Sequence, residues 1–193
     1  PITEEVIGDE PGPLMGGSGT MNDPYRITNV HELQNISFSL SSYYIIENDI
    51  NGTPTESWDG GKGFSPIGTE SSPFTGDLDG KGYNITGLFI DRNGPASIFA
   101  YTNNAKVKNL NVEGDITGRN LVGMICGKQT GGSVKECNVS GKVTGFTNVG
   151  GLVGYCSGTI DDCNSDVLVR GRENGCTSMG GITGLINTGS VND

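Results

Sequence analysis

Pairs of carboxylates are the first side chains in this sequence that could carry chemistry. Asp77 and Asp79 stand two residues apart before a Gly80–Gly82 turn, and Asp161 and Asp162 are adjacent. The first pair could bind Ca²⁺, but this cation takes about six to eight oxygen ligands and no acidic register repeats along the chain. Turn-forming aspartates are the simpler interpretation of Asp77 and Asp79. Asp161 and Asp162 would point to opposite faces of a strand and could share a site only across a turn.

Other kinds of catalytic site find little support in the sequence. Polysaccharide lyases and hydrolases need paired carboxylates, or a basic residue beside acidic metal ligands, and Arg170 and Arg172 are the nearest basic candidates. A Ser-His-Asp or Cys-His site would have to use His31, the one histidine, and no nucleophile motif surrounds any candidate partner. We expect His31 to be a surface residue and the protein to be no enzyme, without a required cofactor.

Five cysteines raise the question of disulfide bonds. Cys137 and Cys163 occupy one column of a repeat described below, and stacking would place their Cα atoms about 4.8 Å apart. They could form a bridge or be two small apolar residues of the core. Cys126, Cys156 and Cys176 fall at or near turns, where one pair could also be bridged. The odd count leaves at least one thiol over, which in an exported protein could link two chains.

Glycans are a second possible theme. Asn35, Asn51, Asn84 and Asn138 each begin an Asn-X-Ser/Thr motif, so each is a candidate N-glycosylation site in an exported chain. Asn84 and Asn138 fall in the repeat frame, which allows their side chains an outward position. Trp58, the single tryptophan, lies in a loop expected over 51–63, where its ring could stack on a sugar or pack on the scaffold.

A repeat of about 27 residues must position most of these side chains. Two blocks recur along the chain, namely Val122–Gly127 with Val149–Gly154 and Met179–Gly184, and Val134–Gly145 with Ile160–Gly171. The column of Ala100, Gly127, Gly154 and Gly184 has spacings of 27, 27 and 30 residues. A fixed period in this range predicts a solenoid, in which each copy is one unit stacked on the next.

The residues inside one period favour strands. Short alternating apolar runs are broken by glycine pairs and by Asn, Ser and Thr, with no helical periodicity. We predict an all-β fold, a right-handed parallel β-helix of about 27 residues per coil, with three short strands and three turns in each coil. Asn29 followed by Glu32 is a capping-box pattern, so one short helix near 30–40 is expected to cover the first coil.

The chain divides into three parts. Residues 1–19 form an acidic arm rich in Pro and Gly, which we expect to dock on this molecule or on a neighbour. Residues 20–193 form one β-helix domain, with an N-terminal capping module over 20–95 and repeats over 96–193. Strands are expected over 25–28, over 43–50 and within 67–90. The last coil breaks off at Val191, so we expect either an excised piece or a coil that another chain completes.

The repeat blocks resemble a known family. Gly150-Gly151-Leu152-Val153-Gly154 is similar to the GLUG repeat of bacterial and archaeal cell-surface proteins. Gly17–Thr20, Asp23–Ile27 and Phe74–Leu88 resemble the module that commonly precedes such repeats, so the likeness runs from about Gly17 to the end. It implies an adhesin-like protein, a large surface protein or the non-catalytic part of a surface peptidase. No catalytic motif accompanies the repeat.

Composition narrows the function classes further. The net charge is −10, and the sequence has no basic stripe that could bind a nucleic acid. It also has no run of 18 apolar residues, so we expect no membrane span. The chain opens on Pro1 without a signal peptide, so we expect an exported, processed protein at the cell surface. The predicted function is structural or adhesive. Self-assembly into a sheath, layer or filament would use the arm and the last coil, with copies of itself or neighbouring surface proteins as partners. A glycan-binding adhesion module is the alternative, and a polysaccharide-degrading enzyme is the least favoured.

Overall fold

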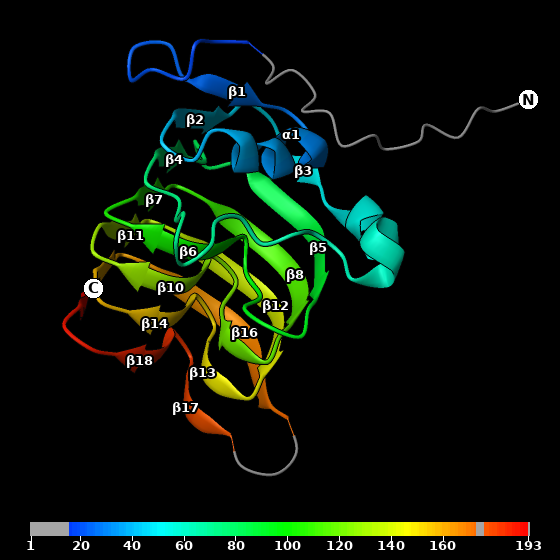
Figure 1. The fold of residues 1–193 in the computed structure, drawn as a ribbon, viewed down its shortest axis with the longest axis vertical. Coiled ribbons are helices and arrows are strands. Elements are labelled where there is room, and N and C mark those ends of the chain that lie inside the picture. Colours follow the sequence, from blue (N-terminus) through cyan, green and yellow to red (C-terminus); the bar gives the residue numbers. More distant parts are fainter. Residues whose placement is uncertain (1–15, 173–175, 193) are drawn as a thin grey trace, which may run out of the picture.

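Four parallel sheets wrap around one apolar core and form a β-solenoid (Figure 1). This computed structural model describes residues 16–172 and 176–192. Each strand of a sheet comes from a different coil, and partners on neighbouring coils, such as Val112 and Val139, lie 27 residues apart. The predicted parallel β-helix with coils of about 27 residues is therefore confirmed.

Two of the sheets are long. Sheet 1 has the order β1 (Tyr25–Ile27), β2 (Tyr43–Ile46), β4 (Asp77–Asp79), β7 (Lys106–Lys108), β11 (Ser133–Lys135), β15 (Thr159–Asp161) and β19 (Ser190–Asn192). Sheet 3 has the order β16 (Asn164–Gly171), β12 (Asn138–Gly145), β8 (Asn111–Thr117), β5 (Asn84–Asp91) and β3 (Ile50–Asn51). Both sheets continue across residues 95 and 96, where the capping module was expected to meet the repeats, since β4 pairs with β7 and β5 with β8.

The other two sheets are built from short strands. Sheet 2 has the order β18 (Thr183–Ile186), β14 (Val153–Cys156), β10 (Cys126–Thr130) and β6 (Phe99–Asn103). Sheet 4 consists of β17 (Thr177–Gly180), β13 (Thr147–Gly150) and β9 (Asn120–Val122). Each repeat coil therefore holds four strands, and the prediction of three was wrong. The extra corner lies in the glycine block, between β13 and β14. The backbone approaches itself so closely there that a Cβ on Gly150 would lie 2.1 Å from the carbonyl oxygen of Val153.

The corners before sheet 3 are not turned by glycine. Asn109, Glu136 and Asp162 hold the same position in successive coils, with φ of +52°, +53° and +49°. This left-handed conformation suits asparagine and aspartate better than most residues. It ends the sheet 1 strand, so that the next residue of each coil turns toward the core or its edge.

Strand boundaries in the N-terminal part differ from those expected. The predicted strand over 43–50 is two strands, β2 and β3, because the chain passes from sheet 1 to sheet 3 between them. The predicted loop over 51–63 contains a 3₁₀ segment, η2 (Thr53–Gly61), which leaves helical geometry from Trp58 to Gly60.

The expected N-terminal helix is present as α1 (Val30–Asn35), followed by the 3₁₀ turn η1 (Ile36–Phe38). The Asn29 side chain accepts a hydrogen bond from the Glu32 amide at 3.0 Å, as an N-cap does. The Glu32 carboxylate reaches back to the amide of Thr28 at 2.6 Å, one residue earlier than in a standard capping box. Val30, Leu33 and Ile36 are buried in the core at the N-terminal end of the stack (Figure 1).

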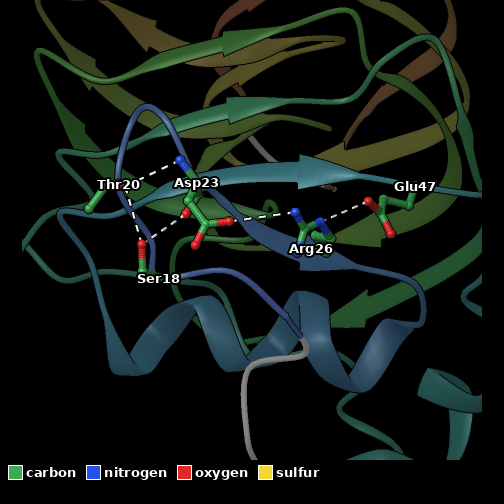
Figure 2. Close-up of polar contacts among 5 residues, drawn as sticks. All are labelled: Ser18, Thr20, Asp23, Arg26 and Glu47. Carbon is green, nitrogen blue, oxygen red and sulfur yellow. Dashed lines mark hydrogen bonds and ion pairs between the residues drawn. The ribbon is translucent and has the colours of Figure 1, made fainter.

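The segment before β1 is fastened to the first coil by polar contacts (Figure 2). Arg26 lies between two carboxylates, 3.5 Å from Asp23 Oδ1 and 3.1 Å from Glu47 Oε1. Ser18 and Thr20 hydrogen-bond to each other, and Thr20 Oγ1 accepts from the amide of Asp23. Of the predicted arm over 1–19, residues 1–15 lie outside the described residues.

Core-facing positions of the last coil are exposed. Leu78, Val107, Val134 and Ile160 form one buried inward column of sheet 1, and the next member, Val191, is 39% exposed. Met179 and Ile186 extend buried columns of sheets 4 and 2 in the same way, with 42% and 46% exposure. These three residues lie on the last described coil, whereas α1 packs at the opposite end of the stack.

Candidate functional site

The outer face of sheet 3 carries a column of four asparagines. Strands β5, β8, β12 and β16 are in register there, so that Asn84, Asn111, Asn138 and Asn164 stand side by side on successive coils. Neighbouring strands are about 4.8 Å apart, so the column runs along the solenoid axis. Each asparagine opens its strand directly after a corner, which leaves its side chain outside the core.

These amides form a ladder of hydrogen bonds. Asn164 Nδ2 donates to Asn138 Oδ1 at 3.0 Å, and Asn138 Nδ2 donates to Asn111 Oδ1 at 2.8 Å. Asn111 Nδ2 donates to the carbonyl of Gly82, and Asn84 Nδ2 to Asp49 Oδ1. A primary amide has two N–H donors and two acceptor lone pairs, so each asparagine keeps donor capacity beyond the ladder. The ladder both holds the coils in register and presents polar groups outward.

A second polar column runs parallel to the first, two residues further along each strand. It consists of Thr86, Glu113, Ser140 and Asp166. The outer face is hollowed here, and the hollow of about 410 Å³ is lined by both columns across all four coils. We call this hollow the amide groove. Its volume falls in the range of about 300–1,000 Å³ typical of ligand sites.

A β-bulge shapes one wall of the amide groove. The register of β5 against β8 shifts between Ile85 and Leu88, and Gly87 within the bulge has φ of +68°. The Gly87 amide then donates to Glu113 Oε2 at 2.7 Å, which fixes the carboxylate at the groove wall. Only glycine fits the bulge, because a Cβ there would lie 2.5 Å from Thr53 Cγ2. Bulges often re-aim side chains beside binding sites.

A smaller hollow of about 240 Å³ adjoins the groove and shares Glu113 with it. Phe89, Asp115, Lys142 and the η2 residue Glu56 line its sides, and Lys142 Nζ contacts both carboxylate oxygens of Asp115 at 3.2 and 3.0 Å. Three glycines, Gly87, Gly114 and Gly141, also line this hollow. Gly114 and Gly141 face a neighbouring strand so closely that a Cβ would lie 2.4 and 2.2 Å from a carbonyl oxygen of that strand.

The four predicted glycosylation sites have different surroundings. Asn84 and Asn138 stand in the asparagine column, and the nitrogen that would carry a glycan donates a hydrogen bond in each, to Asp49 Oδ1 from Asn84 and to Asn111 Oδ1 from Asn138. Asn51 is exposed at the end of β3, and its Oδ1 accepts from Thr53. Asn35 is half-buried at the end of α1. Glycosylation of any of the four stays a prediction.

The predicted carboxylate pairs do not converge on one site. Asp77 and Asp79 lie on the outer face of β4 beside lysines, with Lys108 Nζ and Lys81 Nζ each 3.3 Å from Asp79 Oδ2. Burial would raise the pKa of Asp79, but hydrogen bonds from Asn109, the Lys81 amide and Lys108 lower it overall. Strand β15 ends at Asp161, and the chain turns at Asp162. Asp161 accepts a hydrogen bond from Asn192, whereas Asp162 pairs with Lys135. Over residues 16–172 and 176–192, no group of three or more His, Cys, Asp or Glu side chains could hold a metal ion.

All five candidate disulfide cysteines are free thiols. Cys137 and Cys163 do stack on neighbouring coils, and the Cys137 amide donates to Cys163 Sγ at 3.4 Å. The hydrogen bond with Cys163 and burial both raise the pKa of the Cys137 thiol. Burial raises the pKa of Cys126 to about 12. Cys156 is buried beside Gln129, and Cys176 is half-buried against the carbonyl of Gly145.

Trp58 lies outside the amide groove and packs on the scaffold. Its ring centroid is 4.7 Å from that of the exposed His31 and 6.5 Å from that of the buried Phe64. These contacts agree with the interpretation that Trp58 packs on the scaffold. A sugar-stacking role for Trp58 stays a prediction. Glu113, Ser140 and Asp166 were not among the residues predicted from sequence, although their column and the asparagine column both recur in the aligned repeats.

Comparison with known proteins gives partial likenesses. No protein-family model matches the chain. Halomucin of Haloquadratum walsbyi is 36% identical over 96 residues, which are 46% of this chain and 1% of that protein. A protein of Evansella cellulosilytica described as a Gly-rich membrane protein is 39% identical over 79 residues, which are 40% of this chain and 9% of that protein. The chain thus spans a small part of the length of either relative.

A solved structure supports the fold. A protein from Bacteroides ovatus described as an immunoglobulin A1 protease superposes with a TM-score of 0.63 over 91% of this chain and 66% of that chain, at 19% identity. This likeness concerns the fold alone. Together, the relatives and the solenoid fit a surface β-helix protein. Within the described residues, none of the helices has the length and apolar character needed to cross a membrane.

Proposed function

We propose that this protein is a non-enzymatic extracellular surface protein whose β-solenoid binds glycans in the amide groove. The observation that carries the proposal is the hollow of about 410 Å³ between two polar columns on four successive coils. Sugar hydroxyls both donate and accept hydrogen bonds. Amide and carboxylate side chains in a fixed array match that chemistry.

The repeat of the groove suits a polymeric ligand. Each coil adds one asparagine and one residue of the second column, so the same pair of positions recurs about every 4.8 Å along the axis. A polysaccharide lying across the strands would meet similar contacts from one sugar to the next. Such binding gains strength from repetition of moderate contacts rather than from one deep pocket.

An exported, processed protein at the cell surface is the setting we infer. The likeness to a protein described as a Gly-rich membrane protein and the resemblance to GLUG repeats support it. The net charge of −10 suits an exposed soluble surface. All five cysteines are free thiols, so a cysteine that links two chains would have to pair with a thiol of another molecule.

We propose binding without catalysis in this groove. Glycoside hydrolases place two carboxyl groups across one bond, about 5–5.5 Å apart in retaining enzymes and about 6.5–9.5 Å apart in inverting ones. The strands of Glu113 and Asp166 are two spacings apart, roughly 9.6 Å, which is beyond the retaining distance and at the upper limit of the inverting one, and the Glu113 carboxylate accepts a hydrogen bond from the Gly87 amide. We therefore expect bound oligosaccharides to remain intact, and the appearance of new reducing ends would favour the hydrolase alternative.

A bulky substitution in the groove tests the proposed function. Ser140 lies in the middle of the second column, and Ser140→Trp would fill the hollow. Ser133, a half-buried outward serine of sheet 1 in the same coil, provides the matched control Ser133→Trp. We expect wild-type and Ser133→Trp proteins to be retained on a panel of immobilised polysaccharides and Ser140→Trp to be released. Equal behaviour of the two variants would contradict the proposal.

Self-association into a sheath, layer or filament, with copies of itself as partners, is a second proposal for the same cell-surface setting.

The test of this second role is the mass of the protein in solution. Light scattering of the wild type should give a dimer or a larger species. A 20.1 kDa monomer at every concentration would contradict self-association. The groove and its ligand binding would remain as the proposed function.

A further inference from the structure

We infer that the amide groove selects polysaccharides whose sugars carry free amino groups. This inference rests on the proposed glycan binding and specifies the ligand class. It starts from the charges of the two adjoining hollows, whose charged lining residues are Glu56, Glu113, Asp115, Asp166 and Lys142.

The positive charge in this set is already paired. Lys142 Nζ contacts both oxygens of Asp115, so these two residues compensate each other. Glu56, Glu113 and Asp166 have no cationic partner among the residues that the structure describes. Arg170 is exposed on the same strand as Asp166 but lines neither hollow. The groove therefore offers uncompensated negative charge to a ligand.

The spacing of these carboxylates distinguishes a polymer from a single ion. Glu113 and Asp166 belong to one column with Ser140 between them, so two strand spacings, roughly 9.6 Å, separate their backbones. One Ca²⁺ needs oxygens within about 2.6 Å and would not be shared by the two. A polymer that presents a cationic group on the same side at every second unit could contact both carboxylates.

Chains of β-1,4-linked amino sugars have this property. Successive sugars of such a chain are turned over relative to each other, so every second amino group points to the same side. Along the groove, two ammonium groups would face Glu113 and Asp166, and the sugar between them would face Ser140. Hydroxyls on the other side would meet the asparagine column, where the Oδ1 atoms of Asn84 and Asn164 accept no hydrogen bond from the residues that the structure describes.

The experiment compares two oligosaccharides that differ only in the amine. Calorimetry at about pH 5.5, above the usual carboxyl pKa values, would use a β-1,4-linked glucosamine hexamer and its fully N-acetylated counterpart. We expect the amine form to bind at least about ten-fold more tightly, with affinity that falls as salt rises. Acetylation removes the charge and keeps the chain length and linkage.

Charge-matched variants locate the effect. The double variant Glu113→Gln/Asp166→Asn should lose most of the preference for the amine form, since Gln can still accept the Gly87 hydrogen bond. The control Asp77→Asn/Asp161→Asn changes the net charge equally on the outer face of sheet 1. Circular dichroism confirms that both variants are folded.

The outcomes separate the two proposals. Equal binding of both oligosaccharides, or tighter binding of the acetylated form, would overturn the inference and leave glycan binding intact. Binding of neither hexamer, with retention of the wild type on another polysaccharide, would also overturn the inference alone. Failure on every glycan would overturn both. An equal loss of amine preference in the control variant would show a non-local charge effect and contradict the assigned site.

Discussion

The side-chain nitrogen of Asn138 lies 2.8 Å from the side-chain oxygen of Asn111, its counterpart one coil earlier. The contact repeats between Asn164 and Asn138, so that side chains as well as strands join successive coils. It also gives the predicted glycosylation motif at Asn138 a second meaning, because a glycan would replace one hydrogen of a nitrogen that already serves the ladder. The same two residues line the amide groove.

Removing one amide should weaken the stack. Asn138→Ala deletes one donated and one accepted hydrogen bond, so we expect the free energy of unfolding to fall by about 1–2 kcal/mol. Urea unfolding followed by circular dichroism measures the change. Asn22→Ala, at an exposed asparagine whose side chain makes no hydrogen bond in the described part of the chain, is the control. Equal midpoints for the two variants would mean that the ladder adds no stability.

A methyl group on Gly141, in the smaller hollow beside the amide groove, should be costly. Gly141 has φ of +106°, and its Cβ would lie 2.2 Å from the Gly114 carbonyl oxygen, whereas Gly82 has φ of +82° with open space around it. Gly82→Ala should cost about 1–2 kcal/mol through its backbone conformation alone. Gly141→Ala should cost at least about 2 kcal/mol more, because neighbouring strands must separate. Thermal unfolding of both variants tests the difference, and similar losses would argue against the close strand approach.

Alkaline pH should expose the buried phenol of Tyr44. Burial raises its pKa from 10.0 to about 12, and its hydroxyl donates to the Ser39 carbonyl at 2.6 Å. Because the folded pKa lies above the unfolded one, its contribution to stability is complete below pH 10 and is lost as pH rises toward 12. Tyr44→Phe should be less stable at neutral pH and show a flatter decline over this window. Parallel pH profiles for both proteins would contradict this assignment.

Thiol labelling should find five free cysteines. Cys163 and Cys176 are half-buried and should react first in the native protein, whereas Cys126, Cys137 and Cys156 are buried and should react only on unfolding. Mass spectrometry after alkylation, without reductant, counts the modified residues in each state. A count of three in the unfolded protein would reveal a disulfide that this structure does not contain.

The repeat made the stacking of coils predictable from sequence. Equal spacing placed Cys137 on Cys163 and implied parallel strands, because a coil of constant length must return to the same sheet. The number of strands per coil was less accessible. Gly150 and Gly151 read as one turn, yet the close approach of Gly150 to the Val153 carbonyl makes a further corner between two short strands.

The candidate site was predictable only in part. The asparagine column is visible when the repeats are aligned, since Asn111, Asn138 and Asn164 hold equivalent positions. The bulge at Gly87 was not predictable, because it depends on how Thr53 of another segment packs against β5. The orientation of Glu113 follows from that bulge through the Gly87 amide, so the hollow required three-dimensional packing to be seen.

The most direct test of the account is to map where a bound glycan contacts the molecule. Isotope-labelled protein would be titrated with the oligosaccharide that binds most tightly, and the shifts of backbone and side-chain amides followed by NMR. We predict the largest changes at the side-chain amides of the asparagine column and along the outer face of β8 and β12, with sheet 1 unaffected. Changes confined to Asp77–Asp79 and Lys106–Lys108, or none at saturating ligand, would contradict the amide groove as the binding site.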